Sequence, residues 1–213
     1  MEDCRQLLRA AGFAAVSGAD GSRVALAPPA ARREPAPTPA AVATWAIDRE
    51  QMAALADRYF MVDERCCGES ILKSGCEALG IRSELFPDIA LGLGGGIGLQ
   101  GHVCGAVSAA ALVVSLALAK KTPDYGSRKM ATFQAAGRVC AALEKRFGSV
   151  ECRQMCGLDL TTGEGLGRLM SGVKAEKCAG FVKETARVLA DELSAVLQGN
   201  ANAEPRGAFS HGE

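Results

Sequence analysis

The sequence predicts an all-α protein: a single bundle of about five helices, with a buried alanine-rich central helix and a glycine-rich loop. Three observations support this fold class. Alanine, leucine and glycine are plentiful, whereas aromatic residues make up only 5% of the chain, which indicates closely packed helices. Apolar residues recur at helical spacing in several segments. No segment shows the alternation of apolar and polar residues that is typical of a strand.

The first two helices are expected in the segment after residue 47. Asp48 and Gln51 form a capping-box pattern, and apolar residues follow them at helical spacing. A second helix is predicted over about residues 66–79, and Gly80 ends it.

Residues 103–119 form the most apolar segment, with no charge over 17 positions. A bilayer crossing needs about 20 apolar residues, and this segment also lacks flanking Trp or Tyr anchors. We therefore interpret it as an alanine-rich helix that is buried on all sides and expect no transmembrane segment.

Two more helices complete the predicted bundle. One covers residues 128–147 and ends at Gly148; the other runs from near Cys178 to about Leu197. The apolar stripe expected on the first of them consists of Met130, Phe133, Cys140, Leu143 and Phe147.

The composition divides the chain into three parts. Residues 1–45 form a degenerate leader-like segment and an Ala/Pro-rich linker, residues 46–198 the helical domain, and residues 199–213 a disordered tail. The leader resembles a twin-arginine signal with Cys4 in place of the first arginine, but Asp20 and Arg23 interrupt its apolar run. We therefore expect a cytoplasmic protein, with periplasmic export as the alternative.

Charge and cysteine usage exclude several classes of function. The 24 basic and 24 acidic residues cancel, which disfavours binding to nucleic acid or to a membrane through a polybasic segment. Nine scattered cysteines do not resemble the disulfide framework of a small secreted domain. They fit reduced thiols or metal ligands better.

The segment before the central helix contains Gly96, Gly98 and Gly101 in the spacing of a dinucleotide-binding fingerprint. That fingerprint has a mechanism only within a strand–turn–helix unit, and no convincing strand precedes these glycines. We expect instead that residues 94–101 let the backbone approach a bulky inorganic guest, and that they set the approach to Cys104.

Three cysteines, Cys67, Cys104 and Cys178, fall near predicted helix N-termini, where the helix dipole favours a thiolate. Cys152 follows the turn after the fourth helix. Thiolates suit Zn(II), Cu(I) and iron–sulfur clusters, and the intervals of 37, 48 and 26 residues between these cysteines require assembly by tertiary structure. Spacing does not distinguish zinc from a cluster.

Four segments carry a resemblance to a known family: "RCCGES", "GLGGGIG" with "GHVCGAVSA", "FGSVECRQMCGLDL" and "KCAGFVKETARVL". Over roughly residues 50–195 the chain resembles the C-GCAxxG-C-C redox-active proteins, also called split-Soret cytochrome-like. The resemblance implies a helical domain whose four cysteines, Cys67, Cys104, Cys152 and Cys178, bind a metal or prosthetic group. In split-Soret-type relatives that group is an iron–sulfur centre. Ala109 replaces the signature's last glycine, and no C-x-x-C-H haem attachment motif is present.

The remaining candidates receive simpler interpretations. Cys140 is expected to be a core residue, and Cys76 lies on a different stripe from Cys67. Cys156 could be a fifth ligand or a thiol beside the ligands, whereas Cys66 is left out because neighbours rarely bind one metal together. His102 is more often a solvated loop residue than a ligand.

The leading hypothesis is a redox or electron-transfer protein that binds an iron–sulfur cluster through the four signature cysteines, with [2Fe–2S] preferred to [4Fe–4S]. The alternatives are a thiol–disulfide oxidoreductase that uses the same cysteines, and a zinc-stabilised helical scaffold or metal-carrier module. The expected partner is an unidentified redox protein, and a homodimer is left open.

Overall fold

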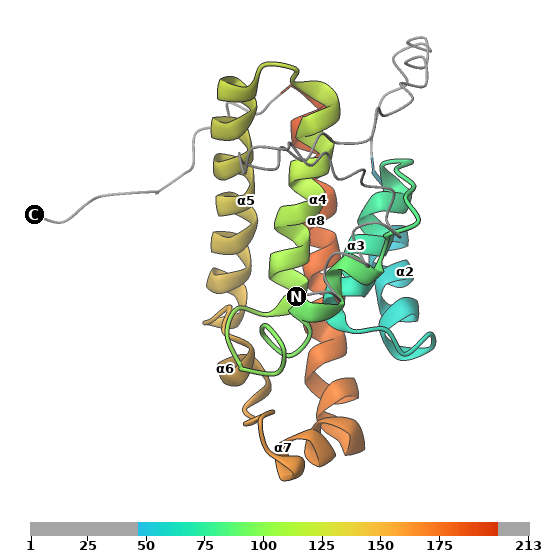
Figure 1. Cartoon of the computed structure of the whole chain (residues 1–213), viewed down its shortest axis with the longest axis vertical. Helices are drawn as coiled ribbons and strands as arrows, with labels where there is room; N and C mark the ends of the chain where they lie inside the picture. The colour runs from blue at the N-terminus through green and yellow to red at the C-terminus, as the bar shows by residue number, and fades with distance from the viewer. Residues whose placement is uncertain (1–46, 200–213) are drawn as a thin grey trace, which may run out of the picture. The chain divides into compact units, whose positions relative to one another are not determined.

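The computed structural model describes residues 47–199, and the regular structure within this range is helical, with no β-strand. Five helices of 12 residues or more confirm the all-α bundle, and two shorter α-helices accompany them (Figure 1). The leader-like segment, the linker and residues 200–213 lie outside the described residues. In chain order the elements are α2 (Arg49–Met61), α3 (Cys67–Ala78), the 3₁₀-helix η1 (Asp88–Leu93), α4 (Gly105–Lys121), α5 (Tyr125–Phe147), α6 (Cys152–Cys156), α7 (Gly163–Arg168), the π-helix η2 (Leu169–Cys178) and α8 (Ala179–Gln198).

The predicted helix boundaries agree with local capping. The Asp48 carboxylate accepts hydrogen bonds from the backbone N–H groups of Glu50 and Gln51 at 3.0 and 2.9 Å, which satisfies two amides that lack a partner inside the helix. At the C-terminal end of α5, the longest helix, Gly148 adopts a left-handed φ of 77°. A residue with a side chain takes up this conformation at a cost, so glycine ends the helix here.

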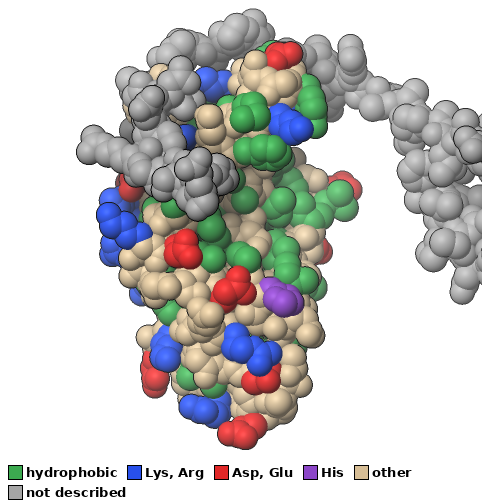
Figure 2. Space-filling model, turned by 90° about the vertical axis from the view of Figure 1, so that its left-hand side faces the viewer, with side chains coloured by type: hydrophobic (Ala, Val, Ile, Leu, Met, Phe, Trp, Pro, Cys, Tyr) green, Lys and Arg blue, Asp and Glu red, His purple; other side chains and the backbone are tan. Residues whose placement is uncertain are grey.

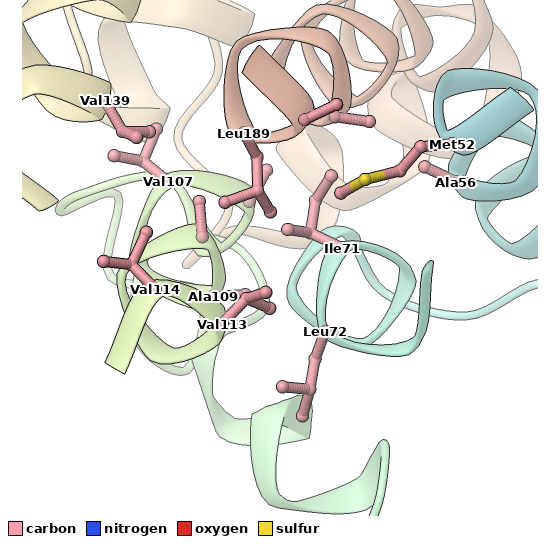
Figure 3. Packing of buried hydrophobic residues seen from close by; sticks show 14 of the residues in the cluster. Met52, Ala56, Ile71, Leu72, Val107, Ala109, Val113, Val114, Val139 and Leu189 are labelled. Atoms are coloured by element: carbon pink, nitrogen blue, oxygen red, sulfur yellow. The ribbon is translucent and has the colours of Figure 1, made fainter. Parts of the chain in front are cut away.

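Helix α4 lies at the centre of the bundle and packs against α3, α5 and α8. Val113 is fully buried, together with Ile71 of α3 and Leu189 of α8 (Figure 3). The approach of α3 depends on Gly75, where an added Cβ would lie 2.7 Å from Cγ1 of Val113. The central buried helix is thus confirmed, except that one edge faces solvent: Leu112 is 38% exposed.

The apolar stripe expected on α5 is wrong in its first half. The residues that α5 buries are Ala135, Val139 and Leu143, which lie four residues apart on one face. Met130 and Phe133 are 56% and 61% exposed, and Figure 2, which looks onto the side of the bundle where α5 lies, shows hydrophobic side chains at the surface. Small residues can face the neighbouring helices more closely than large ones, so the larger apolar side chains point outward. The two other expected members, Cys140 and Phe147, are half-buried against the core.

The last helix begins next to Cys178, as predicted, but the helix N-terminus there is not free. The ten-residue π-helix η2 leads directly into α8, and Cys178 at the junction has helical dihedral angles, φ −64° and ψ −36°. A π-helix bonds each N–H to the carbonyl five residues earlier, as Ala179 does with Lys174. Cys178 therefore lies inside a continuous helical run and is not at a free helix N-terminus.

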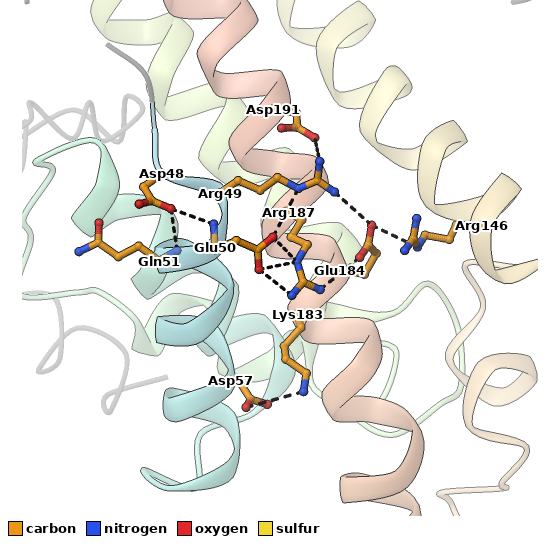
Figure 4. A network of polar contacts seen from close by, with 10 residues as sticks. All are labelled: Asp48, Arg49, Glu50, Gln51, Asp57, Arg146, Lys183, Glu184, Arg187 and Asp191. Atoms are coloured by element: carbon orange, nitrogen blue, oxygen red, sulfur yellow. Dashed lines mark hydrogen bonds and ion pairs between the residues drawn. The ribbon is translucent and has the colours of Figure 1, made fainter. Parts of the chain in front are cut away.

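A buried carboxylate ties three helices together. The side chain of Glu184 in α8 is only 6% exposed, and its oxygens lie 3.9, 3.1 and 3.4 Å from nitrogens of Arg49, Arg146 and Arg187 (Figure 4). These arginines belong to α2, α5 and α8. Three cations offset the cost of burying one carboxylate, and the cluster fixes how α2 and α5 lie against α8.

Helices α3, α4 and α8 all begin at the end of the bundle where α6 and α7 lie, the lower end in Figure 1. Cysteines near the starts of these helices are therefore brought to the same end of the molecule. None of the helices formed by residues 47–199 has both the length and the apolar character that a membrane span requires.

Candidate functional site

A cavity of about 410 Å³ lies at this end of the bundle. Its wall contains six cysteines, and we call it the thiol cavity. Most of the remaining wall is apolar, with Phe60, Met155, Leu160 and Phe181 among its residues. All four cysteines singled out in the sequence line this one cavity, together with Cys156, which was considered as a fifth ligand, and Cys66, which was left out. The six are Cys66, Cys67, Cys104, Cys152, Cys156 and Cys178.

Cys67 is the first residue of α3, and its sulfur lies against the start of α4. A hydrogen bond with the Cys104 thiol, reinforced by burial, raises the pKa of Cys67 well above its usual value. Backbone hydrogen bonds from Gly95 and Ala106 act in the opposite direction. These amides could stabilise a thiolate at Cys67, but the neighbouring thiol and the apolar surroundings outweigh them.

Cys104 and Cys152 are brought together by a short antiparallel backbone pairing. The N–H of Cys104 donates to the Val150 carbonyl at 2.8 Å, and the N–H of Cys152 donates to the His102 carbonyl at 2.7 Å. The pairing holds the N-cap residue of α4 beside the first residue of α6. Two cysteines 48 residues apart in sequence thereby face one cavity.

The glycine loop, residues 94–101, packs onto this pairing. At Gly96 a Cβ would collide with the His102 backbone and lie 2.9 Å from Cβ of Cys152. At Gly101 a Cβ would lie 2.9 Å from Cβ of Arg153, whereas Gly98 has open space around it and lines the cavity. Of the three glycines expected at a cofactor, Gly98 therefore lies on the cavity wall, and the other two position the segment that carries Cys152. The loop lies close to Cys152 at Gly96 and close to Cys66 at Gly94, and these contacts do not single out Cys104.

The backbone of the loop also excludes a dinucleotide-binding unit. A 3₁₀-helix precedes the glycines where that unit requires a strand. Residues 95–99 all have positive φ, between 57° and 71°. Ile97 and Leu99 belong to this run, although residues with large side chains rarely adopt such angles. Strain of this kind is found at functional sites, where the surrounding structure holds it in place.

Helix α6 carries two of the cavity thiols one turn apart. Cys152 and Cys156 are separated by four residues and so share a helix face, as expected if the segment is helical. Burial, together with the neighbouring Cys156 and Cys67, raises the pKa of Cys152 to about 12. Burial and the same two neighbours raise the pKa of Cys178 to about 12. The cavity therefore favours neutral thiols when no cation compensates a negative sulfur.

Cys66 lines the cavity but also has a structural role that the sequence reasoning missed. Its sulfur accepts the N–H of Glu69 at 3.5 Å, while the Glu69 carboxylate accepts the N–H of Cys66 at 2.9 Å and pairs with Arg65 at 3.0 Å. This is a capping box with cysteine in the place of serine or threonine. The pattern Cys-x-x-Glu at residues 66–69 was the signal that could have identified both residues. Burial raises the pKa of the Cys66 thiol to about 12.

The other candidates lie away from the cavity. Cys76 is buried in the core on α3, and Cys140 is half-buried on α5. His102 is exposed and does not line the cavity, as expected of a solvated loop residue. Lys174 of η2 does line it, and its Nζ lies 4.9 Å from the centre of the Phe60 ring.

The chemistry of the donors restricts the guest. Within residues 47–199, no three Cys, His, Asp or Glu side chains are gathered closely enough to hold a single metal ion. The cysteine sulfurs nevertheless line one cavity, and the Cys67 and Cys104 side chains form a hydrogen bond. Soft thiolate donors fit zinc or an iron–sulfur cluster in kind.

The fold and this cavity define a helical, cysteine-rich protein whose thiols from separate helices meet at one end of the bundle. The chain belongs to the family described as "Putative redox-active protein (C_GCAxxG_C_C)", whose model matches residues 65–192. This range includes all six cavity cysteines, and family membership gives the chain a general redox role. Neither the curated proteins nor the solved structures provide a match.

Proposed function

We propose that this protein transfers electrons through an iron–sulfur cluster held in the thiol cavity by Cys67, Cys104, Cys152 and Cys178. One observation carries the proposal: these four cysteines come from separate segments of the chain and line one cavity with a largely apolar wall. Four thiolates are the ligand set of both common cluster types. We retain [2Fe–2S] as the preferred type on the family resemblance.

The cavity thiols would have to lose their protons to bind a metal. Burial and neighbouring thiols hold the pKa of Cys67, Cys152 and Cys178 above the usual range, so these thiols are neutral near pH 7. Metal binding replaces thiol protons and stabilises the thiolates. Iron would therefore convert a set of neutral buried thiols into ligands.

The chain's own residues would tune and protect the cofactor. A bound cluster would supply one-electron redox chemistry. The backbone N–H groups of Gly95 and Ala106 donate hydrogen bonds to the Cys67 sulfur. They would stabilise a ligating thiolate and influence the reduction potential of the cluster. The Lys174 ammonium group would offset part of the negative charge, and Phe60 and Phe181 would exclude water.

One alternative fits the cavity less well. A thiol–disulfide oxidoreductase needs an exposed attacking thiol with a low pKa, but the pKa of Cys67, Cys152 and Cys178 is raised. A structural zinc site would use the same four thiolates, so metal analysis separates it from a cluster.

The test is anaerobic purification, followed by reconstitution with ferrous iron and sulfide. We expect iron and sulfide in equal amounts on the folded chain, with visible charge-transfer absorption that reduction bleaches. Colourless protein with stoichiometric zinc would contradict the proposal in favour of a zinc scaffold. Protein without metal that forms one specific internal disulfide on mild oxidation would support the oxidoreductase.

A further inference from the structure

The thiol cavity holds more cysteines than a four-thiolate cluster needs. Cys66 is accounted for, because its sulfur caps α3. Cys156 is not: it is 3% exposed and lines the cavity. Its sulfur lies 3.9 Å from the Leu158 carbonyl and forms a hydrogen bond with the Cys152 side chain. A buried thiol that contacts a proposed ligand in the wall of a thiol site is placed to share the role of that ligand.

The position of Cys156 relates it to Cys152. Both lie on one face of α6, and side chains four residues apart on a helix have Cβ atoms about 5–6 Å apart. Cys156 also lies near Cys178. It is among the neighbours that raise the pKa of the Cys178 thiol, as it is for Cys152. A metal bound near Cys152 and Cys178 would therefore have the Cys156 sulfur within reach.

Helix α6 is suited to a small readjustment. It has only five residues, and Gly157 ends it with a left-handed φ of 75°. The Cys156 carbonyl accepts a hydrogen bond from Nζ of Lys177 at 3.4 Å, and this flexible side chain can follow a shift. Because backbone hydrogen bonds to residues 101 and 102 hold the first turn of α6, the readjustment is confined to the end of the helix that carries Cys156.

We infer that Cys156 is an exchangeable ligand that takes over the iron held by Cys152. The inference rests on the proposed cluster. In the exchange, the Cys156 thiol releases its proton to solvent and its sulfur binds the iron, while the Cys152 sulfur leaves the iron and takes up a proton. No electrons are transferred. The cluster keeps four thiolates when Cys152 is lost, for example by oxidation.

The test compares the wild type, Cys152→Ser, Cys156→Ser and the double variant after anaerobic reconstitution with ferrous iron and sulfide. Iron and sulfide per chain are measured on protein whose helicity by circular dichroism equals that of the wild type. Cys152→Ala replaces Cys152→Ser if the serine variant does not fold. Cys140→Ser, whose thiol lies outside the cavity, is the control.

We expect Cys156→Ser to load like the wild type. Cys152→Ser should keep most of its iron, with shifted absorption and electron paramagnetic resonance signals, because one sulfur ligand has changed position. The double variant should lose nearly all of it. If Cys152→Ser is as empty as the double variant, or if Cys156→Ser alone is empty, the exchange is overturned. Both outcomes leave the proposed function intact, whereas a wild type that takes up no iron and sulfide contradicts the proposed function itself.

Discussion

Cys67 is the cysteine at which the contacts of the thiol cavity meet. Its thiol forms a hydrogen bond with that of Cys104, and it is near enough to Cys66, Cys152 and Cys178 to raise the pKa of each. This central position follows from α3 and α4, whose N-terminal ends meet at the cavity. A ligand there has several neighbours with which to share a cluster.

The glycines of the loop differ in what a side chain would disturb. Gly96→Ala should cost about 1–3 kcal/mol of stability, because its Cβ has no space beside His102 and Cys152. It should also reduce iron loading, because it displaces the segment that carries Cys152. Gly98→Ala, with open space but a φ of 57°, should cost only about 1 kcal/mol. Denaturant unfolding and iron content measure both effects. Equal behaviour of the two variants would contradict the packing described for Gly96.

Substitution of Cys66 distinguishes its role as a helix cap from a role as a metal ligand. Cys66→Ala should lower the free energy of unfolding by about 1 kcal/mol, because it removes the cap of α3, while iron loading stays at the wild-type level. Cys66→Ser should preserve both, since serine is a good N-cap. Denaturant unfolding and iron analysis provide the readouts. Loss of iron in the serine variant would show that Cys66 is a ligand.

At the residue level, the sequence predicted four of the six cysteines that line the cavity: Cys67 and Cys104 from their places at helix starts, and the set of four from the family resemblance. It left the role of Cys156 open, since α6 is a five-residue helix with no stripe to read. Glu69 was missed because a cysteine cap departs from the usual Ser/Thr pattern.

At the scale of elements, the main helix boundaries were predictable, but the continuous helical backbone ahead of Cys178 was not. Asp48 and Gly148 identify a helix start and a helix end from the sequence. No capping residue precedes Cys178, because the helical backbone continues from η2. The exposed Phe133 shows a second limit: an apolar stripe and a stripe of small residues coexist on α5, and only the neighbours α4 and α8 decide which one is buried.

The ion cluster that joins α2, α5 and α8 can be tested at Glu184. Glu184→Gln should lower the free energy of unfolding by about 1–3 kcal/mol, because it leaves Arg49, Arg146 and Arg187 without their shared buried carboxylate. The arginines are partly solvated, which limits the loss. Denaturant unfolding measures it, with the exposed Glu50→Gln as the matched control. A control as destabilised as Glu184→Gln would contradict the role given to the buried carboxylate.

At the scale of the whole molecule, the cavity lies at one end of the core, most of which consists of residues outside the cavity wall. The buried residues of α2, α3, α4, α5 and α8 form one continuous cluster. The sequence predicted this core from its helical periodicity, but not the depth or volume of the cavity, which depends on how loops and short helices pack. The redox partner and a homodimer stay predictions.

We therefore expect the metal-free protein to fold. Its far-ultraviolet circular dichroism should equal that of the loaded protein, and loading should raise the melting temperature, because the cofactor binds the native state. Hydrogen exchange should slow mainly in residues 94–104 and 150–157, which surround the cavity. A metal-free chain without helical structure would contradict the independence of the core.

The most direct test of the central claim is the iron and sulfide content per folded chain of Cys104→Ser beside that of Cys140→Ser, after identical anaerobic reconstitution. Serine at position 104 replaces a soft anionic donor in the cavity by a hydroxyl, so the variant should lose nearly all iron and sulfide. Serine at the half-buried position 140 should cost roughly 1–3 kcal/mol of stability and leave loading unchanged. If Cys104→Ser keeps its full iron and Cys140→Ser loses it, the thiol cavity is not the cofactor site.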